Sequence, residues 1–202
     1  MVAFRKLFAS AMALAVPVIA QITPAQIVSN IQLITQKSQA LQAPAQSISI
    51  INGPLIVIGQ GPFPEIIRGL SDIVITGTNA ISQMQGTPAV VPGADSDAIY
   101  NAFREFVRVH QTLLNVLIGK AGLLNTVPYI GQPMSLVLRQ VESVVDTIAF
   151  SLIDTVQSRT SDLQGQAASL DGSLQTAINS YDGLSLNRRS LRYARREIAA
   201  TA

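Results

Sequence analysis

Apolar residues recur along most of the chain at the three- and four-residue spacing of an amphipathic helix. Similar stripes begin after Thr23, near Pro62 and near Pro133. The only β-branched run lies between Ser47 and Gly59, and glycine and proline interrupt it. The pattern predicts an all-α bundle of about five amphipathic helices. Its sharpest stripe carries Ile99, Phe103, Phe106, Val107, His110, Leu113, Leu114 and Leu117.

Local signals predict where the first helices begin and break. Thr23 followed by Pro24 is the pattern of an N-cap and a first helical residue. Pro44 predicts a break near Ala43, because proline removes a helical hydrogen bond and crowds the preceding turn. The loop GTPAVVPGAD should end where Asp95 or Ser96 caps the next helix.

The last long stripe begins near Pro133 and continues as far as Tyr181. We expect either one bent helix or two, with Gly165 and Gly172 as the weak points. The segment DGLSLNRR should end the helical region.

Three long segments carry no charged residue at all: 38–64, 73–94 and 121–138. A single buried stripe does not need so much uncharged sequence. The segments predict either an apolar cavity that holds an acyl chain or helix faces that open onto an oily surface. The alternative is a stable, fully packed aliphatic core.

The composition supports a folded, aliphatic protein. Hydrophobic residues make up 48% of the 202 residues, but aromatic residues only 5% and charged residues only 13%. A chain so apolar and so weakly charged is not expected to be disordered. It contains no cysteine, which excludes disulfides and thiolate chemistry.

The first twenty residues have the features of a secretory signal peptide. Arg5 and Lys6 precede the apolar run LFASAMALAV, and small residues at Val18 and Ala20 fit cleavage after Ala20. An uncleaved anchor is the alternative, but the run is short for a membrane span. We therefore divide the chain into a signal peptide (1–20), a helical domain (21–184) and a tail (185–202), and expect a secreted protein without a transmembrane segment.

The tail differs from the domain in charge. Five arginines face one acidic residue there, a net charge of +4. Without the signal peptide, 12 basic and 12 acidic residues remain, so the domain carries −4. The tail is expected to be disordered and solvated; it could also contact anionic lipid or wall polymer, or be cut at Arg188-Arg189 or Arg195-Arg196. Nucleic acid is not an expected partner.

Catalysis finds little support in the sequence. The chain has one histidine and none of the common hydrolase, phosphate-loop, dinucleotide or zinc-protease motifs. We predict neither an enzyme nor a metal or cofactor site. His110 is interpreted either as a core histidine whose ring nitrogens have partners, or as a polar contact for a lipid carboxylate. Tyr100, Tyr129 and Tyr181 offer hydroxyls for the same purpose.

Six large side chains on predicted inner faces are the candidate ligand-binding residues. They are Phe63, Ile67, Phe103, Phe106, His110 and Phe150.

Three segments of the chain are similar to a known protein family. They are ITPAQIVSNIQLITQKSQALQAPAQSI, FREFVRVHQTLLNVLIGKAGLL and PMSLVLRQVESVVDTIAFSLIDTV. Together with the absence of cysteine, they resemble the fungal hydrophobic surface-binding protein A family, which includes cell wall galactomannoproteins. The resemblance implies a secreted helical bundle that adsorbs to hydrophobic surfaces or binds long-chain fatty acids. It also implies secreted hydrolases as possible partners.

The resulting hypothesis is a secreted, non-enzymatic protein that binds lipids or hydrophobic surfaces. The alternative is a structural or interaction protein of the fungal cell wall or extracellular matrix, with a packed core and a surface that binds wall polysaccharide.

Overall fold

The chain is described here in a computed structural model, which covers residues 22–49, 51, 55, 59–123 and 131–200, with side chains up to Asp182. The predicted signal peptide and its cleavage after Ala20 lie outside the described residues. So does Tyr129.

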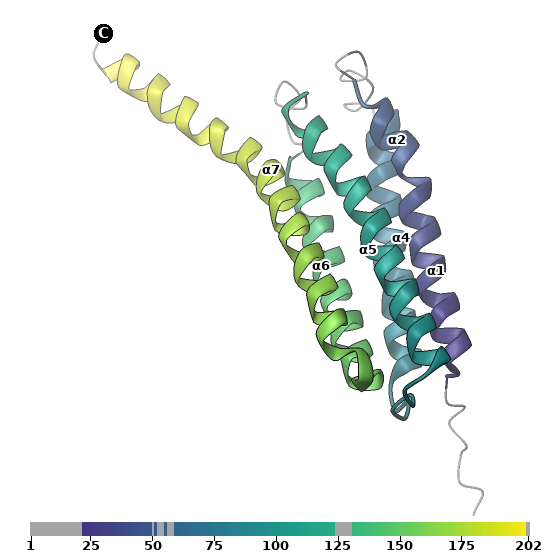
Figure 1. Cartoon of the computed structure of the whole chain (residues 1–202). Coiled ribbons are helices and arrows are strands. Elements are labelled where there is room, and N and C mark those ends of the chain that lie inside the picture. The colour runs from purple at the N-terminus through teal and green to yellow at the C-terminus, as the bar shows by residue number, and fades with distance from the viewer. Residues whose placement is uncertain (1–21, 50, 52–54, 56–58, 124–130, 201–202) are drawn as a thin grey trace, which may run out of the picture.

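The described residues are helical and contain no strand, so the all-α prediction is confirmed (Figure 1). Within the residues that the structure describes, the elements include five long helices, a short helix and a 3-10 turn. In order they are α1 (Pro24–Ala40), α2 (Gln42–Ser47), α4 (Pro62–Met84), α5 (Ala94–Ala121), α6 (Gly131–Thr155), η3 (Gln157–Arg159) and α7 (Thr160–Ala200).

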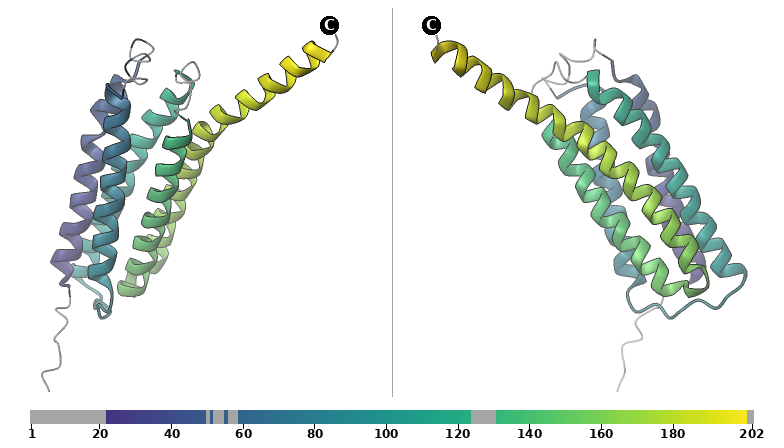
Figure 2. Two further views of the ribbon diagram at one scale, coloured as in Figure 1. Left: turned by 180° about the vertical axis from the view of Figure 1, so that it is seen from behind. Right: turned by 60° about the vertical axis from the view of Figure 1, so that its left-hand side comes forward.

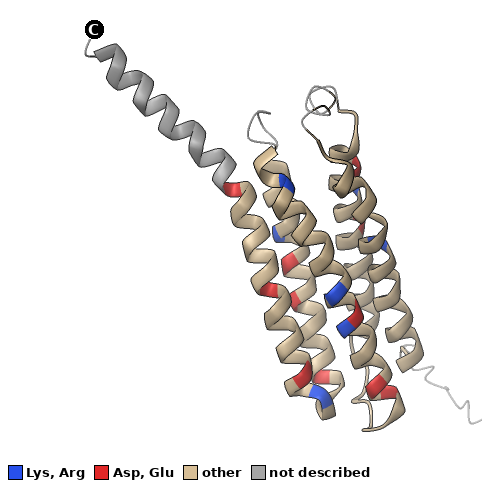
Figure 3. Ribbon diagram, turned by 45° about the horizontal axis from the view of Figure 1, so that its top comes forward, with Lys and Arg blue, Asp and Glu red and all other residues tan. Residues whose placement is uncertain are grey.

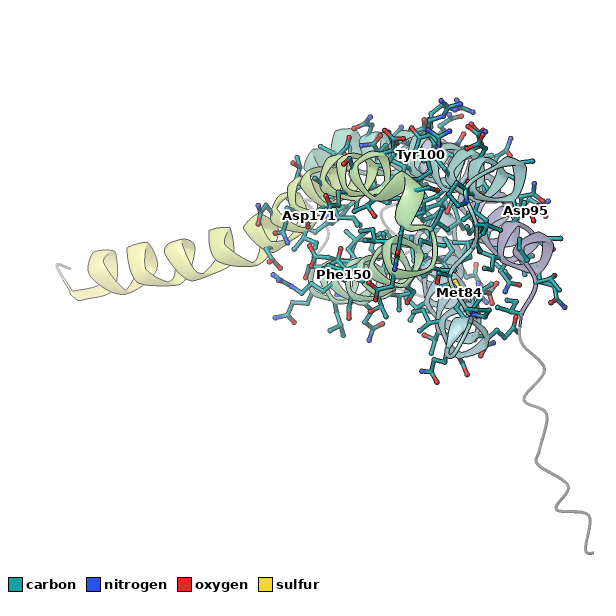
Figure 4. The ribbon with its side chains drawn as sticks, turned by 60° about the horizontal axis from the view of Figure 1, so that its bottom comes forward. Met84, Asp95, Tyr100, Phe150 and Asp171 are labelled. Atoms are coloured by element: carbon teal, nitrogen blue, oxygen red, sulfur yellow. The ribbon has the colours of Figure 1, made fainter. Side chains whose placement is uncertain are left out.

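The long helices form a closed ring in which each packs against two others. The order around the ring is α1, α5, α7, α6, α4 and back to α1. The views in Figure 2 and the end-on view in Figure 4 show this arrangement. Helices consecutive in sequence are not always ring neighbours, since α5 packs closely against neither α4 nor α6. The inner faces of all five helices therefore meet in one common interior.

The start of α1 and its break follow the sequence signals. Thr23 caps α1, and its hydroxyl accepts a hydrogen bond from the Gln26 backbone N–H at 3.2 Å. The break falls at Leu41, which separates α1 from α2, two residues before the predicted position. Proline is tolerated in the first turn of α2, where no intrahelical donor is lost. The helix therefore stops one turn ahead of Pro44.

The predicted cap of α5 is wrong by a few residues. Gly93, at φ 146°, is the N-cap, and Asp95 and Ser96 lie inside the first turn. The Ser96 hydroxyl accepts a hydrogen bond from the Gly93 N–H at 3.0 Å and thus serves the cap from the third helical position. Only glycine adopts this backbone conformation readily, which explains why the helix begins there.

The predicted bend in the last stripe is a full reversal between two helices. It lies at Val156 and η3, whereas Gly165 and Gly172 are ordinary positions within α7. The turn contains neither glycine nor proline, so no local signal marks it. Tertiary contacts hold it instead: the Val90 N–H donates to the Thr155 carbonyl at 2.7 Å, and Arg159 Nη2 donates to Asp97 Oδ1 at 2.6 Å.

Helices α4 and α6 approach closely because of a glycine. Gly77 is buried, and a Cβ added there would overlap the side chain of Val144. Valine is stiff at χ1 and has little room to move aside. Gly77 is thus the position on the buried face of α4 where a side chain would prevent this approach.

Helix α7 continues to Ala200, beyond the segment DGLSLNRR that was expected to end it. Side chains beyond Asp182 lie outside the described residues. The disorder of the tail therefore stays a prediction.

A buried histidine in an aliphatic interior

The interior of the ring is built almost entirely from aliphatic side chains. Ile27, Leu70, Leu114, Leu138 and Leu174, one from each long helix, have no exposed surface. All of these residues except Leu138 fall on the predicted stripes, so the sequence identified most of the inward-facing positions. The common interior is large, continuous and poor in polar atoms, and any polar group within it requires a partner.

His110 is the exception within this interior. Its side chain lies on the buried face of α5 and has no exposed surface. Its Nδ1 is 2.9 Å from the hydroxyl oxygen of Ser38 on α1. Ser38 is equally buried, and its hydroxyl also donates to the Ile34 carbonyl at 3.0 Å. The pair thus links α1 to α5 at a point where both helices are otherwise apolar.

The second ring nitrogen of His110, Nε2, is buried and has no hydrogen-bond partner in the described structure. Burial lowers the pKa of His110 to about 4, because an apolar interior disfavours the charged imidazolium. The ring is therefore neutral at pH 7. A buried polar atom without a partner costs roughly 1–3 kcal/mol, so Nε2 is a position where a polar group of a ligand gains a free hydrogen-bonding site.

The structure places five of the six predicted ligand-binding residues at the core. Phe103 and Phe106 are buried side by side on α5, with ring centroids 6.1 Å apart, and the Phe106 and His110 centroids are 5.4 Å apart. Phe63 is buried in the first turn of α4, and Ile67 is half-buried against the same core. Helices α4 and α5 run in opposite directions (Figure 1).

The placement of Phe150 on an inner face is wrong. Its side chain is 68% exposed on α6 (Figure 4). The buried stripe of α6 passes through Val145, Ile148 and Leu152. Residue 150 is two positions from each of the last two and therefore points about 200° away from them on a helix of 3.6 residues per turn.

The tyrosine hydroxyls that were considered as head-group contacts are placed elsewhere. Tyr181 is buried, but its hydroxyl donates to the Leu117 carbonyl at 2.9 Å. The half-buried Tyr100 ring lies beneath the guanidinium groups of Arg104 and Arg159, 5.7 and 5.6 Å from its centroid. Neither is turned toward His110 as a partner for Nε2.

Sequence reasoning did not single out Ser38, a small polar residue on the buried face of α1. The available signal was a hydroxyl on an otherwise apolar helix face, since such a group needs a partner when buried. The identity of that partner, 72 residues away on α5, had no signal in the sequence.

A separate groove of about 620 Å³ opens on the outer surface between α1 and α5. Its walls are mostly polar or small, and none of the predicted ligand-binding residues contributes to it. The groove is lined by Val28, Gln32, Thr35, Gln36, Ala98, Asn101, Ala102 and Glu105.

Charged side chains are scattered along the helices rather than gathered at one place (Figure 3). Several pair between neighbouring helices, including Lys37 with Asp72 and Arg139 with Asp182. Among the described residues, no three histidine, aspartate or glutamate side chains come together as metal ligands would. None of the described helices has the length and apolar content needed to span a bilayer.

Fold and site together define an all-α ring bundle with an aliphatic interior and a buried serine–histidine pair. No protein-family model matches the sequence, and no curated protein sequence matches it.

Solved structures with the same fold do exist. A crystal structure of AfMP4p in complex with palmitic acid superposes with a TM-score of 0.70 at 17% identity, covering 79% of this chain and 99% of that one. Ligand-binding domain 2 of the Penicillium marneffei MP1 protein, complexed with multiple arachidonic acids, gives 0.64 at 12% identity, covering 79% and 94%. Ligand-binding domain 1 of the same protein, complexed with arachidonic acids, gives 0.62 at 15% identity, covering 78% and 95%.

Proposed function

We propose that this protein binds long-chain fatty acids or related single-chain lipids in the interior of its helical ring. The observation that carries the proposal is the unpartnered, fully buried Nε2 of His110 in a bundle whose interior is built from aliphatic side chains. The proposal is also supported by the similarity in fold to proteins whose structures were solved with palmitic acid and with arachidonic acids. The same reasoning favours a binding protein over an enzyme, since the described residues hold no cluster of ionisable groups in a cleft.

The gain from burying an acyl chain is large enough for stable binding. A 16-carbon chain that buries about 400 Å² gains on the order of 10 kcal/mol at roughly 25 cal/mol per Å². The loss of translational and conformational freedom on binding offsets part of this gain, which leaves an affinity in the micromolar range or tighter. The helices must part to admit the chain, and the aliphatic contacts between them are replaced by contacts with the ligand.

Native mass spectrometry of the protein with palmitate or arachidonate tests the proposal. We expect an added mass equal to one or more fatty acids, lost on collisional activation. Phe106→Asp, which puts a charge beside His110, should abolish the added mass, whereas the same change at exposed Phe150 should leave it intact. Circular dichroism confirms that both variants are folded. A bare mass for the unmodified protein at saturating fatty acid would contradict the proposal.

A second function is favoured by the exposed apolar residues on the outer faces. Ile75 on α4 and Leu136 on α6 are each 60% exposed, and Phe150 on α6 is 68% exposed. Such residues suit adsorption to a hydrophobic surface. Replacing all three with serine should release the protein from octyl-coated beads while leaving fatty-acid uptake unchanged. If release and uptake change together, one surface serves both functions.

Secretion and a place in the cell wall or extracellular space are part of the same proposal. They rest on the signal-peptide pattern of residues 1–20. Secreted hydrolases and wall polysaccharide stay predicted partners, since no contact among the described residues bears on them.

A further inference from the structure

The hydrogen bonds around Ser38 determine which nitrogen of His110 carries the proton. A hydroxyl has one hydrogen to donate and two lone pairs that accept. The Ser38 hydroxyl donates its hydrogen to the Ile34 carbonyl at 3.0 Å, the bond that buried serines commonly make within a helix. With its hydrogen engaged in that way, the Ser38 oxygen, 2.9 Å from Nδ1, favours the tautomer in which Nδ1–H donates to it.

A neutral imidazole carries only one N–H. With that hydrogen on Nδ1, Nε2 has a lone pair and no hydrogen. This lone pair is buried and unpartnered. The vacant position is therefore an acceptor, and a carboxylate anion, which also only accepts, is repelled from it. Only a group that brings its own hydrogen satisfies Nε2.

No charged side chain acts on this position from the helices around it. Lys37 on α1 pairs with Asp72 on α4, and Arg108 on α5 pairs with Glu105, all at the surface. The pKa of His110 is lowered by burial, with no contribution from a neighbouring charge. Further along α5, Lys120 donates to the Ile48 carbonyl at 2.8 Å. On α7, Asp171 is exposed, and the buried Tyr181 hydroxyl donates to the Leu117 carbonyl.

We propose that Nε2 of His110 accepts a hydrogen bond from an O–H in the head group of the bound lipid, so that a fatty acid binds together with one proton. This inference rests on the proposed function and specifies the head group that it accepts. A fatty acid in water at pH 7 is an anion. The bound state contains the anion plus one proton, held between a carboxyl oxygen and Nε2; no other bond forms or breaks. A fatty alcohol carries the required hydrogen already and binds without proton uptake.

Isothermal titration calorimetry with three 12-carbon lipids tests the proposal on the unmodified protein. The probes are dodecanoate, 1-dodecanol and methyl dodecanoate, which has no O–H. The apparent Kd of dodecanoate should rise about tenfold per pH unit between pH 6 and pH 8, because each unit lowers the proton concentration tenfold. The buffer dependence of its enthalpy should report one proton taken up. The Kd of 1-dodecanol should not change with pH, and methyl dodecanoate should bind more weakly than 1-dodecanol.

The variant His110→Gln provides a second test. Glutamine offers both an N–H donor and a carbonyl acceptor and does not titrate. The variant should therefore bind dodecanoate as the anion, with a Kd that is constant from pH 6 to pH 8, while it still binds 1-dodecanol. Because His110 is the only histidine in the chain, nitrogen NMR of the unmodified protein also reports the tautomer directly. We expect hydrogen on Nδ1, and a shift of the Nε2 signal when 1-dodecanol is added.

The outcomes separate this proposal from the proposed function. Binding of dodecanoate without proton uptake, equal binding of the alcohol and the ester, or a hydrogen found on Nε2 would each overturn the head-group assignment and leave lipid binding in place. Failure of all three lipids and of palmitate to bind would overturn both.

Discussion

The interfaces of helix α5 with α7 and with α1 differ in whether their polar side chains find partners within the protein. Toward α7, Gln111 Nε2 donates to the Ser169 carbonyl at 3.0 Å and lies within hydrogen-bond distance of the Ser169 and Ser173 hydroxyls. Further along, the Tyr181 hydroxyl donates to the Leu117 carbonyl. Toward α1, the Ser38–His110 pair leaves Nε2 without a partner.

The difference separates a fully partnered interface from the one that a ligand completes under the proposed function. Polar groups that find all their partners within the protein fix the register of two helices and add to stability. A buried group that lacks a partner lowers stability, and a packed aliphatic interior would be more stable with leucine in its place. His110 therefore makes sense as part of a site that a ligand completes, and the following variants test that contrast in order of expected effect.

The largest effect should be a loss of stability in acid that depends on His110. The pKa of histidine is about 6.5 in the unfolded chain and about 4 when folded. Between these values the unfolded state binds a proton that the folded state does not. The free energy of unfolding therefore decreases as the pH is lowered from 6.5 to about 4. The fall amounts to about 3 kcal/mol across the window. His110→Leu should lose less stability than the unmodified protein over this range in urea unfolding.

Tyr181→Phe, which keeps His110, is the control for that comparison. It should show the same acid-dependent loss as the unmodified protein. If His110→Leu and the unmodified protein respond equally to acid, His110 is not buried as described.

Ser38→Ala should have the next largest effect at neutral pH. The substitution leaves Nδ1 of His110 as a buried donor with no partner, at a cost of about 1–3 kcal/mol. In the His110→Leu background the same substitution should cost much less, because no donor is then stranded. A double-mutant cycle in urea unfolding measures this coupling. Additive effects would show that the two side chains do not interact.

Tyr181→Phe should cost about 1 kcal/mol, the typical contribution of one hydrogen bond. Burial raises the pKa of the Tyr181 hydroxyl above its ordinary value, so the hydroxyl stays protonated and the cost should be the same from pH 4 to pH 9. Thermal unfolding over that range checks the prediction. A cost that disappears at pH 9 would contradict the described hydrogen bond.

Ser173→Ala should have the smallest effect, within about 0.5 kcal/mol. Gln111 keeps both contacts to Ser169 when the Ser173 hydroxyl is removed. Ser173→Ala and Ser38→Ala both remove one hydroxyl group. The first does so between α5 and α7, where the polar groups have partners, and the second between α5 and α1, where Nε2 of His110 has none. Equal losses for the two serine variants in urea unfolding would remove the distinction between the interfaces.

Some of the differences between the predictions and the structure could have been avoided. Phe150 was chosen for its size, although helical geometry turns it away from Ile148 and Leu152. Others could not. The reversal at Val156 has no glycine or proline, and its causes, Val90 and Asp97, lie about 60 residues earlier in the chain. A turn held by distant partners leaves no local pattern to recognise.

The helices, most of their inward faces and the aliphatic character of the interior could be predicted from the sequence, because hydrophobic periodicity and capping depend on residues within one or two turns. The position of His110 on a buried stripe could be predicted as well. The order of the helices around the ring and the serine that faces the histidine became visible only in the folded structure. Those features depend on pairing between residues far apart in the chain, and the same pairing leaves Nε2 as the buried ring atom without a partner.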